Sequence, residues 1–87
     1  MGKAAQRRIT IDLSRAGDVA AMHETIAKRL RLGPDYGRNF DALYDALTEY
    51  GTGWKLTFKG VPAFAAALKD VCADAAAATP GLEIAFR

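Results

Sequence analysis

The chain has 87 residues, 51% of them hydrophobic, and a formal charge of +2 at pH 7. This length suits one small domain with one core, and it excludes an enzyme built from separate catalytic and substrate lobes. The single cysteine, Cys72, excludes an internal disulfide and leaves no second thiol for a zinc site. No apolar stretch approaches the roughly 20 residues that span a bilayer, and the basic N-terminus lacks the apolar core of an export signal. We therefore expect one cytoplasmic domain over residues 1–87, with a flexible N-terminus at residues 1–7.

Charge is distributed unevenly along the chain. Residues 1–31 carry a net charge of +4 and residues 55–87 a net charge of +1, whereas residues 32–54 carry −3. The acidic side chains of the chain are thus concentrated in its middle.

The first half of the chain predicts one strand and two helices. Apolar residues alternate from Arg8 to Leu13, as in a half-buried strand. Helical spacing then follows Asp18, a suitable N-cap, and predicts a helix that ends near Leu32. After a Gly-Pro break, Asn39 is the expected N-cap of a second helix that reaches about Tyr50.

The second half predicts two further strands around one helix. Alternation from Trp54 to Phe58 indicates a strand, Pro62 opens an alanine-rich helix that reaches about Ala78, and alternation from Leu82 to Phe86 indicates a closing strand. Helical crossovers between the strands favour a parallel sheet with right-handed connections. Since all three strands alternate, only one sheet face is buried. The expected fold class is α/β, a two-layer β-α-α-β-α-β domain with a three-stranded parallel sheet and helices on one face.

The second helix has two distinct faces. The apolar face, expected to pack in the core, carries Phe40, Leu43, Leu47 and Tyr50. The opposite face carries carboxylates at i, i+4 and i+8: Asp41, Asp45 and Glu49. Like charges at this spacing weaken a helix by a few tenths of a kcal/mol per pair. They would suit a strongly basic surface on which carboxylates imitate phosphates, but a merely solvated helix face fits the same pattern.

The run LGPDYGRNFDALYDALTEY, from Leu32 to Tyr50, resembles the loop and second helix of the barstar family of intracellular ribonuclease inhibitors. His23-x-Thr25, followed by a basic helix end, is similar to the family's first helix, and the order of elements also matches. The resemblance covers nearly the whole chain. It implies a non-enzymatic, monomeric antitoxin or immunity protein that binds a bacterial ribonuclease one to one.

In that family the loop and second helix plug the ribonuclease active site, and the resemblance implies roles by position. Asp45 would be the main phosphate mimic, with Asp41 supporting it one turn earlier. Asn39 would cap the helix and, with Gly37, hold the loop toward the enzyme, while Tyr44 stands where the family has Trp. The full expected set of partner-binding residues is Asp35, Tyr36, Gly37, Asn39, Asp41, Tyr44, Asp45, Thr48, Glu49 and Asp74.

Some positions depart from the family's pattern. Asp35 replaces the first of two paired tyrosines, which removes an aromatic contact and adds a charge. Asp74 corresponds to a contact acid of the last helix in one alignment, but a slip of two residues would place alanine there. The segment after the second strand is short, so we expect a small helix of the family to be absent. The slightly basic overall charge, where the family's namesake is acidic, suggests a less basic target enzyme.

Other interpretations remain open from the sequence. His23 is interpreted as structural or solvated, because no second histidine is present, and Cys72 as a packed thiol. We expect no metal and no cofactor, since no phosphate-loop or dinucleotide motif occurs. A non-nuclease protein partner fits the same surface. A nucleic-acid-binding domain could use the basic open sheet face, although no aromatic residue alternates onto that face for base stacking.

Overall fold

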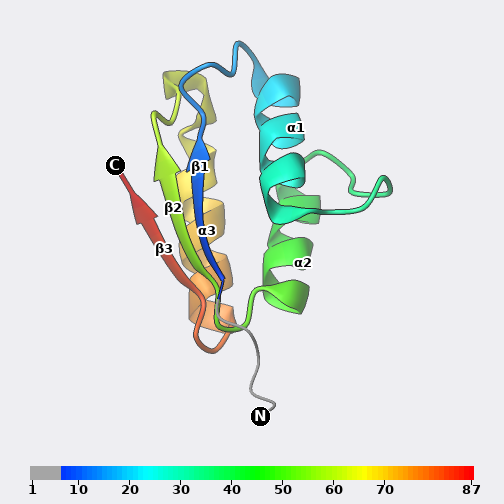
Figure 1. The fold of residues 1–87 in the computed structure, drawn as a ribbon, viewed down its shortest axis with the longest axis vertical. Coiled ribbons are helices and arrows are strands. Elements are labelled where there is room, and N and C mark those ends of the chain that lie inside the picture. Colours follow the sequence, from blue (N-terminus) through cyan, green and yellow to red (C-terminus); the bar gives the residue numbers. More distant parts are fainter. Residues whose placement is uncertain (1–6) are drawn as a thin grey trace.

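The computed structural model describes residues 7–87, and Figure 1 shows its three strands and three helices. In chain order the elements are β1 (Arg8–Asp12), α1 (Val19–Leu30), α2 (Phe40–Tyr50), β2 (Lys55–Lys59), a 3-10 turn η1 (Ala63–Ala65), α3 (Ala67–Ala78) and β3 (Glu83–Phe86). The strands lie in the order β1-β2-β3, and both pairs are parallel. The predicted fold class and element order are confirmed. Of the segment predicted to be flexible, residues 1–6 lie outside the described residues.

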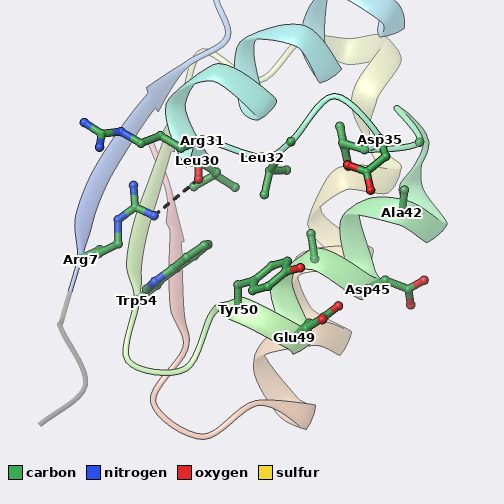
Figure 2. A pocket seen from close by; sticks show the side chains of 14 residues that line it. Arg7, Leu30, Arg31, Leu32, Asp35, Ala42, Asp45, Glu49, Tyr50 and Trp54 are labelled. Atoms are coloured by element: carbon green, nitrogen blue, oxygen red, sulfur yellow. Dashed lines mark hydrogen bonds between the residues drawn. The ribbon is translucent and has the colours of Figure 1, made fainter.

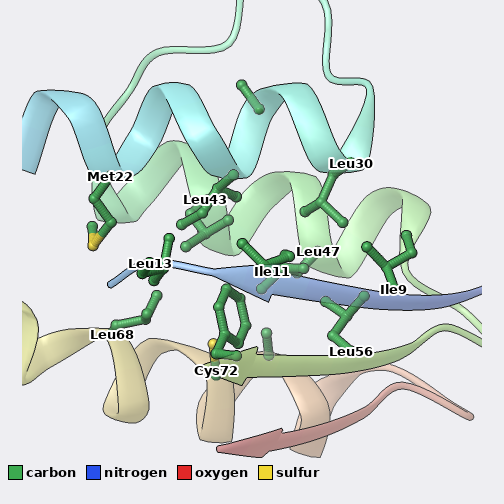
Figure 3. Close-up of a cluster of buried hydrophobic side chains, with 14 of the residues drawn as sticks. Ile9, Ile11, Leu13, Met22, Leu30, Leu43, Leu47, Leu56, Leu68 and Cys72 are labelled. Carbon is green, nitrogen blue, oxygen red and sulfur yellow. The ribbon is translucent and has the colours of Figure 1, made fainter. Parts of the chain in front are cut away.

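The sheet register gathers the apolar strand residues on one face. Ile9 lies beside Leu56, which lies beside Ile84, and the next row begins with Ile11 beside Phe58. Residues that alternate with these on β1 and β2 are exposed or half-buried. The helices therefore cover one face of the sheet. Figure 3 shows side chains of this face meeting those of all three helices, among them Met22, Leu43, Leu47, Leu68 and Cys72.

Helix α1 begins as predicted and ends earlier than predicted. The Asp18 carboxylate accepts a hydrogen bond from the Ala21 amide at 2.8 Å, which confirms the N-cap. The helix ends at Leu30 rather than near Leu32 because Arg31 adopts a left-handed conformation with φ of 58°. The Leu32 amide then turns back to the Ala27 carbonyl at 2.9 Å, as in a Schellman-type cap.

Helix α3 begins later than the sequence predicted. Pro62 is extended (φ −67°, ψ 153°), and the chain first makes η1, in which the Ala65 amide donates to the Pro62 carbonyl at 2.9 Å. The α-helical pattern starts at Ala67, without a side-chain cap. Between β2 and α3 the structure therefore holds one 3-10 turn. None of the helices described here is long and apolar enough to cross a membrane.

Tyr50 does not belong to the core, which corrects the predicted apolar face of α2. Its side chain is 57% exposed, whereas Leu43 and Leu47 are fully buried and Ala46 is buried beside them. Tyr50 is the last residue of α2, and it lines an open groove rather than the core. A helical wheel predicts the direction of a side chain from its helix, but it does not show whether other elements cover that side chain.

The Cys72 thiol is predicted to be unreactive in the folded protein. The residue is 1% exposed, and burial raises its pKa to about 12, so little thiolate forms near neutral pH. A disulfide-exchange reagent at mildly alkaline pH should modify the urea-unfolded chain quickly and the native chain only as it unfolds. Cys72→Ala should lower the free energy of unfolding by about 1 kcal/mol through lost packing. Rapid labelling of the native protein would contradict this assignment.

Candidate functional site

A buried polar contact joins helix α1 to the loop that precedes α2. Nδ1 of His23 and the phenol oxygen of Tyr36 lie 2.7 Å apart and are hydrogen-bonded. His23 is fully buried and Tyr36 is 9% exposed. The Phe40 ring packs edge-on against the imidazole at a centroid distance of 5.3 Å. His23 is thus a structural histidine that fixes both the loop and the start of α2.

Burial controls the ionisation of this pair. It lowers the pKa of His23, and it raises the pKa of Tyr36 to about 12. Both groups are therefore neutral near pH 7. Nε2 of His23 has no hydrogen-bond partner among the described residues, so a second proton on the ring would place an unpaired charge in the core.

Arg38 connects the same loop to α1 at a second point. Its Nε donates to the Glu24 carboxylate on α1, and its Nη1 donates to the Tyr36 carbonyl at 3.0 Å. Arg38 itself has φ of 53°, in the left-handed region. The guanidinium, which lowers the pKa of Glu24 by hydrogen bonding, is turned toward α1 and away from the acidic row of α2. The row is therefore not neutralised by its nearest arginine in sequence.

The start of α2 is fixed by a cap and by close backbone approach. The Asn39 side-chain oxygen accepts a hydrogen bond from the Ala42 amide at 2.7 Å, which confirms it as the N-cap. At Gly37 an added Cβ would lie 3.1 Å from the Ala42 Cβ, a contact tighter than side chains normally make. Gly37 therefore lets the loop pass close to the first turn of α2.

The acidic row lies on the solvent side of α2. Asp41, Asp45 and Glu49 are exposed, and none of them forms an ion pair with any residue from 7 to 87. Tyr44, at 36% exposure, stands beside them. The Thr48 hydroxyl donates a hydrogen bond within the helix, to the Tyr44 carbonyl at 3.0 Å. The row thus presents carboxylates that the described residues leave uncompensated.

Part of this surface forms the wall of a groove of about 510 Å³ (Figure 2). Asp35, Asp45 and Glu49 lie on the α2 side of the groove, and Arg7 and Arg31 lie on the side of β1 and α1. Apolar parts of the lining come from Leu30, Leu32, Ala46, Tyr50 and Trp54. The groove is therefore acidic on one wall and basic on the other.

Sequence reasoning missed the basic wall. The Arg7 guanidinium lies 4.9 Å from the centroid of the Trp54 ring and donates to the Leu30 carbonyl at 3.5 Å. These three residues are far apart in sequence, and no periodicity connects them. A long-range cation–π contact of this kind leaves no local signal.

The predicted partner-binding residues fall into three groups in space. The groove is lined by Asp35, Tyr36, Gly37, Asp45 and Glu49. Beside it on α2 and its cap lie Asn39, Asp41, Tyr44 and Thr48. Asp74 is exposed on α3, about 140° around the helix from Lys69. Since Lys69 Nζ lies 5.5 Å from the Phe86 ring on β3, Asp74 points away from that sheet edge.

Two other kinds of site find little support in the described part of the chain. Residues 7–87 hold no group of three or more potential ligands placed to bind a metal ion. The open sheet face carries Arg8 and Thr10, and the Lys55 ammonium lies 3.6 Å from the Glu83 carboxylate. None of the residues that alternate onto this face is aromatic, so it offers no platform for base stacking.

These features define a class of protein, a small binding domain that presents an acidic helix on a braced loop. The family model described as Barstar (barnase inhibitor) matches residues 6–85, and the chain belongs to this family. Membership indicates a non-enzymatic inhibitor of a barnase-like ribonuclease. No curated protein matches the chain.

Acidification is expected to destabilise the protein through His23. Burial lowers the pKa of His23 in the folded state. The unfolded chain therefore binds more protons than the folded chain once the pH falls below the ordinary histidine pKa of about 6.5. The contribution of neutral His23 to the free energy of unfolding should therefore be fully present above about pH 6.5. It should decrease as the pH falls toward the folded-state pKa. Urea titrations across this range measure the change, and His23→Gln should remove this part of the slope. Equal slopes for the two proteins would contradict it.

Proposed function

We propose that the chain is a cytoplasmic inhibitor of a bacterial ribonuclease, of the antitoxin or immunity kind, that blocks the nuclease active site with α2 and the loop before it. The observation that carries the proposal is the uncompensated acidic row on a braced helix. A ribonuclease active site is basic because it binds phosphates, and carboxylates held at fixed positions can replace those phosphates.

Each acidic residue has a distinct part in this proposal. Asp45 is the middle residue of the row and also lies on the groove wall, so we assign it to the centre of the contact. Asp41 supports it one turn earlier, and Glu49 lies one turn later, near the rim. Asp35 extends the acidic wall on the loop side. Asp74 on α3 is a secondary contact.

The neighbouring uncharged residues contribute to the shape of the binding surface rather than to its charge. Tyr44 offers an amphipathic ring of the type enriched at interface hot spots. Tyr36 is buried, so we assign it the task of fixing the loop, together with Gly37 and Asn39. A preorganised loop loses little entropy on binding, which favours affinity.

The basic wall limits the orientation of the partner. Arg7 and Arg31 would repel cationic groups, so the basic active site of a nuclease must face the α2 side of the groove. A partner surface that carries acidic groups beside its basic cleft fits both walls at once.

A direct test is capture of binding proteins from the native cell with the wild-type chain, followed by titration of the captured nuclease. We expect RNA cleavage to fall linearly and to stop near one chain per nuclease. A captured partner without nuclease activity would instead favour a barstar-like surface redirected to another protein. RNA hydrolysis by the purified chain alone would contradict the proposal.

Asp45→Ala is predicted to weaken nuclease binding by at least about 2 kcal/mol, or about 30-fold in Kd. The free energy of unfolding should stay equal or rise slightly, because the substitution relieves repulsion within the acidic row. The matched control is Asp70→Ala, which removes an exposed carboxylate from α3. Calorimetric titration and urea unfolding measure the two quantities. Wild-type affinity for Asp45→Ala would overturn this docking mode even if inhibition itself were confirmed.

Glu49→Gln is predicted to act mainly on the association rate. A rim carboxylate steers the encounter of oppositely charged surfaces, and salt screens this effect. Stopped-flow association should be slower than wild type at low salt and should converge with it at high salt, with a smaller change in dissociation. A variant that altered only the dissociation rate would place Glu49 inside the interface instead.

A further inference from the structure

Strand β3 has one edge that no other described strand covers. It is the last strand in the order β1-β2-β3. The Glu83 amide donates to the Trp54 carbonyl at 2.9 Å, and the Arg87 amide donates to the Phe58 carbonyl at 2.8 Å. Because backbone groups alternate along a strand, those of Ile84 and Phe86 point away from β2. They form a template for a further strand.

The opposite edge of the sheet is closed. On β1 the outward carbonyl of Thr10 accepts a hydrogen bond from Arg29 Nε on α1 at 3.0 Å. An arginine on the central carbonyl of a short strand blocks the approach of another backbone there. Only β3 therefore keeps an edge suited to strand addition within the described part of the sheet.

The sequence of this edge is complementary to itself. It reads Glu83-Ile84-Ala85-Phe86-Arg87, with an acid at one end, a base at the other and the smallest side chain in the centre. If two copies run antiparallel with Ala85 opposite Ala85, each Glu83 faces an Arg87 of the other copy. Ile84 of each copy then faces Phe86 of the other copy.

The backbone geometry of β3 fits this same register. Ile84 and Phe86 are the residues with outward backbone groups, so each pair of them exchanges two hydrogen bonds. Ala85 falls at the non-hydrogen-bonded position, where facing side chains come closest, and its methyl group leaves room for that approach. Hydrogen bonding, apolar contact and charge therefore select one alignment.

Charges already on the sheet favour the same pairing. Glu83 has an ion pair with Lys55 at 3.6 Å, yet its side chain is 68% exposed and can accept a second cation. Arg87 follows Phe86, which pairs with Phe58, so Arg87 lies alongside Lys59. Within residues 7–87 no carboxylate lies in ion-pair range of Arg87. A Glu83 from a second copy would offset the repulsion between these two cations.

We propose that two copies of this chain associate through antiparallel pairing of β3, which produces a continuous six-stranded sheet. The interface is isologous, with the twofold axis at Ala85. Figure 1 places β3 on the side of the molecule opposite the loop between α1 and α2, so both candidate inhibitor surfaces stay open. The proposed dimer differs from the monomer expected from the sequence, and it leaves one candidate inhibitor surface open on each chain.

Charge reversal tests this register. Sedimentation velocity over a range of concentrations should show a reversible dimer of the wild-type chain that weakens with added salt. Glu83→Arg and Arg87→Glu should each weaken dimerisation at least about tenfold, because each places like charges opposite each other at both ends. An equimolar mixture of the two variants should form a heterodimer, in which every facing pair is again of opposite charge.

The control is Arg8→Glu, which makes the same charge change as Arg87→Glu on the far edge of the sheet and should dimerise like wild type. Circular dichroism melts verify that each variant is folded. A wild-type chain that stays monomeric at the highest soluble concentration would overturn the proposal. So would single variants that dimerise like wild type, or a mixture that fails to form the heterodimer. Since no nuclease is present, the result is independent of the proposed inhibitory function.

Discussion

The hydrogen bond between His23 and Tyr36 is the contact on which the candidate site depends most. It lies inside the protein, at 2.7 Å, and it connects α1 to the loop that precedes α2. Leaving a buried polar group without its partner costs about 1–3 kcal/mol, so the bond strongly favours one loop position. Arg38 reinforces that position from outside, through Glu24 and the Tyr36 carbonyl.

Packing and capping allow α2 to carry a charge pattern that opposes its own stability. The row of Asp41, Asp45 and Glu49 repels itself along the helix. The Asn39 cap contributes about 1 kcal/mol in the other direction. Burial of Leu43 and Leu47 contributes about 1.5–3 kcal/mol each. Packing and capping thus outweigh the repulsion, and the carboxylates stay available for a basic partner.

The acidic wall of the groove and the edge of β3 differ in their charge pattern. The acidic wall of the groove offers a set of like charges, which suits a partner of opposite sign. The β3 edge carries one acid and one base in a short segment, which suits a second copy of itself. Their separation on the molecule means that both associations are compatible with one fold.

The fold could be predicted from the sequence because its strands alternate cleanly and its first two helices carry side-chain N-caps. The N-caps Asp18 and Asn39 are both predictable from local sequence alone. Details that depend on distant partners could not be predicted in this way. The burial of Tyr36 against His23 is one such detail, because the two residues are 13 positions apart and lie on different elements. The left-handed Arg31 likewise gives no sequence signal that a helix should end there, since this conformation favours glycine.

The acidic residues of the site were found because they share one helix, whereas the facing wall of Arg7 and Arg31 is assembled from separate parts of the chain. Helical periodicity reports on one element at a time. A groove between elements is determined by the tertiary packing, and the Arg7 contact with Trp54 becomes visible only there.

The most direct measurement of the central claim is amide hydrogen exchange in Tyr36→Phe, which keeps the ring and removes the phenol oxygen. If the bond to His23 holds the loop, exchange of the Tyr36 amide, which donates to the Gly33 carbonyl, and of the Ala42 and Leu43 amides at the start of α2 should accelerate at least about tenfold. Exchange in β1, β2 and β3 should change far less. Unchanged protection of the loop in the folded variant would show that other contacts hold it, and the account of a braced acidic helix would be wrong.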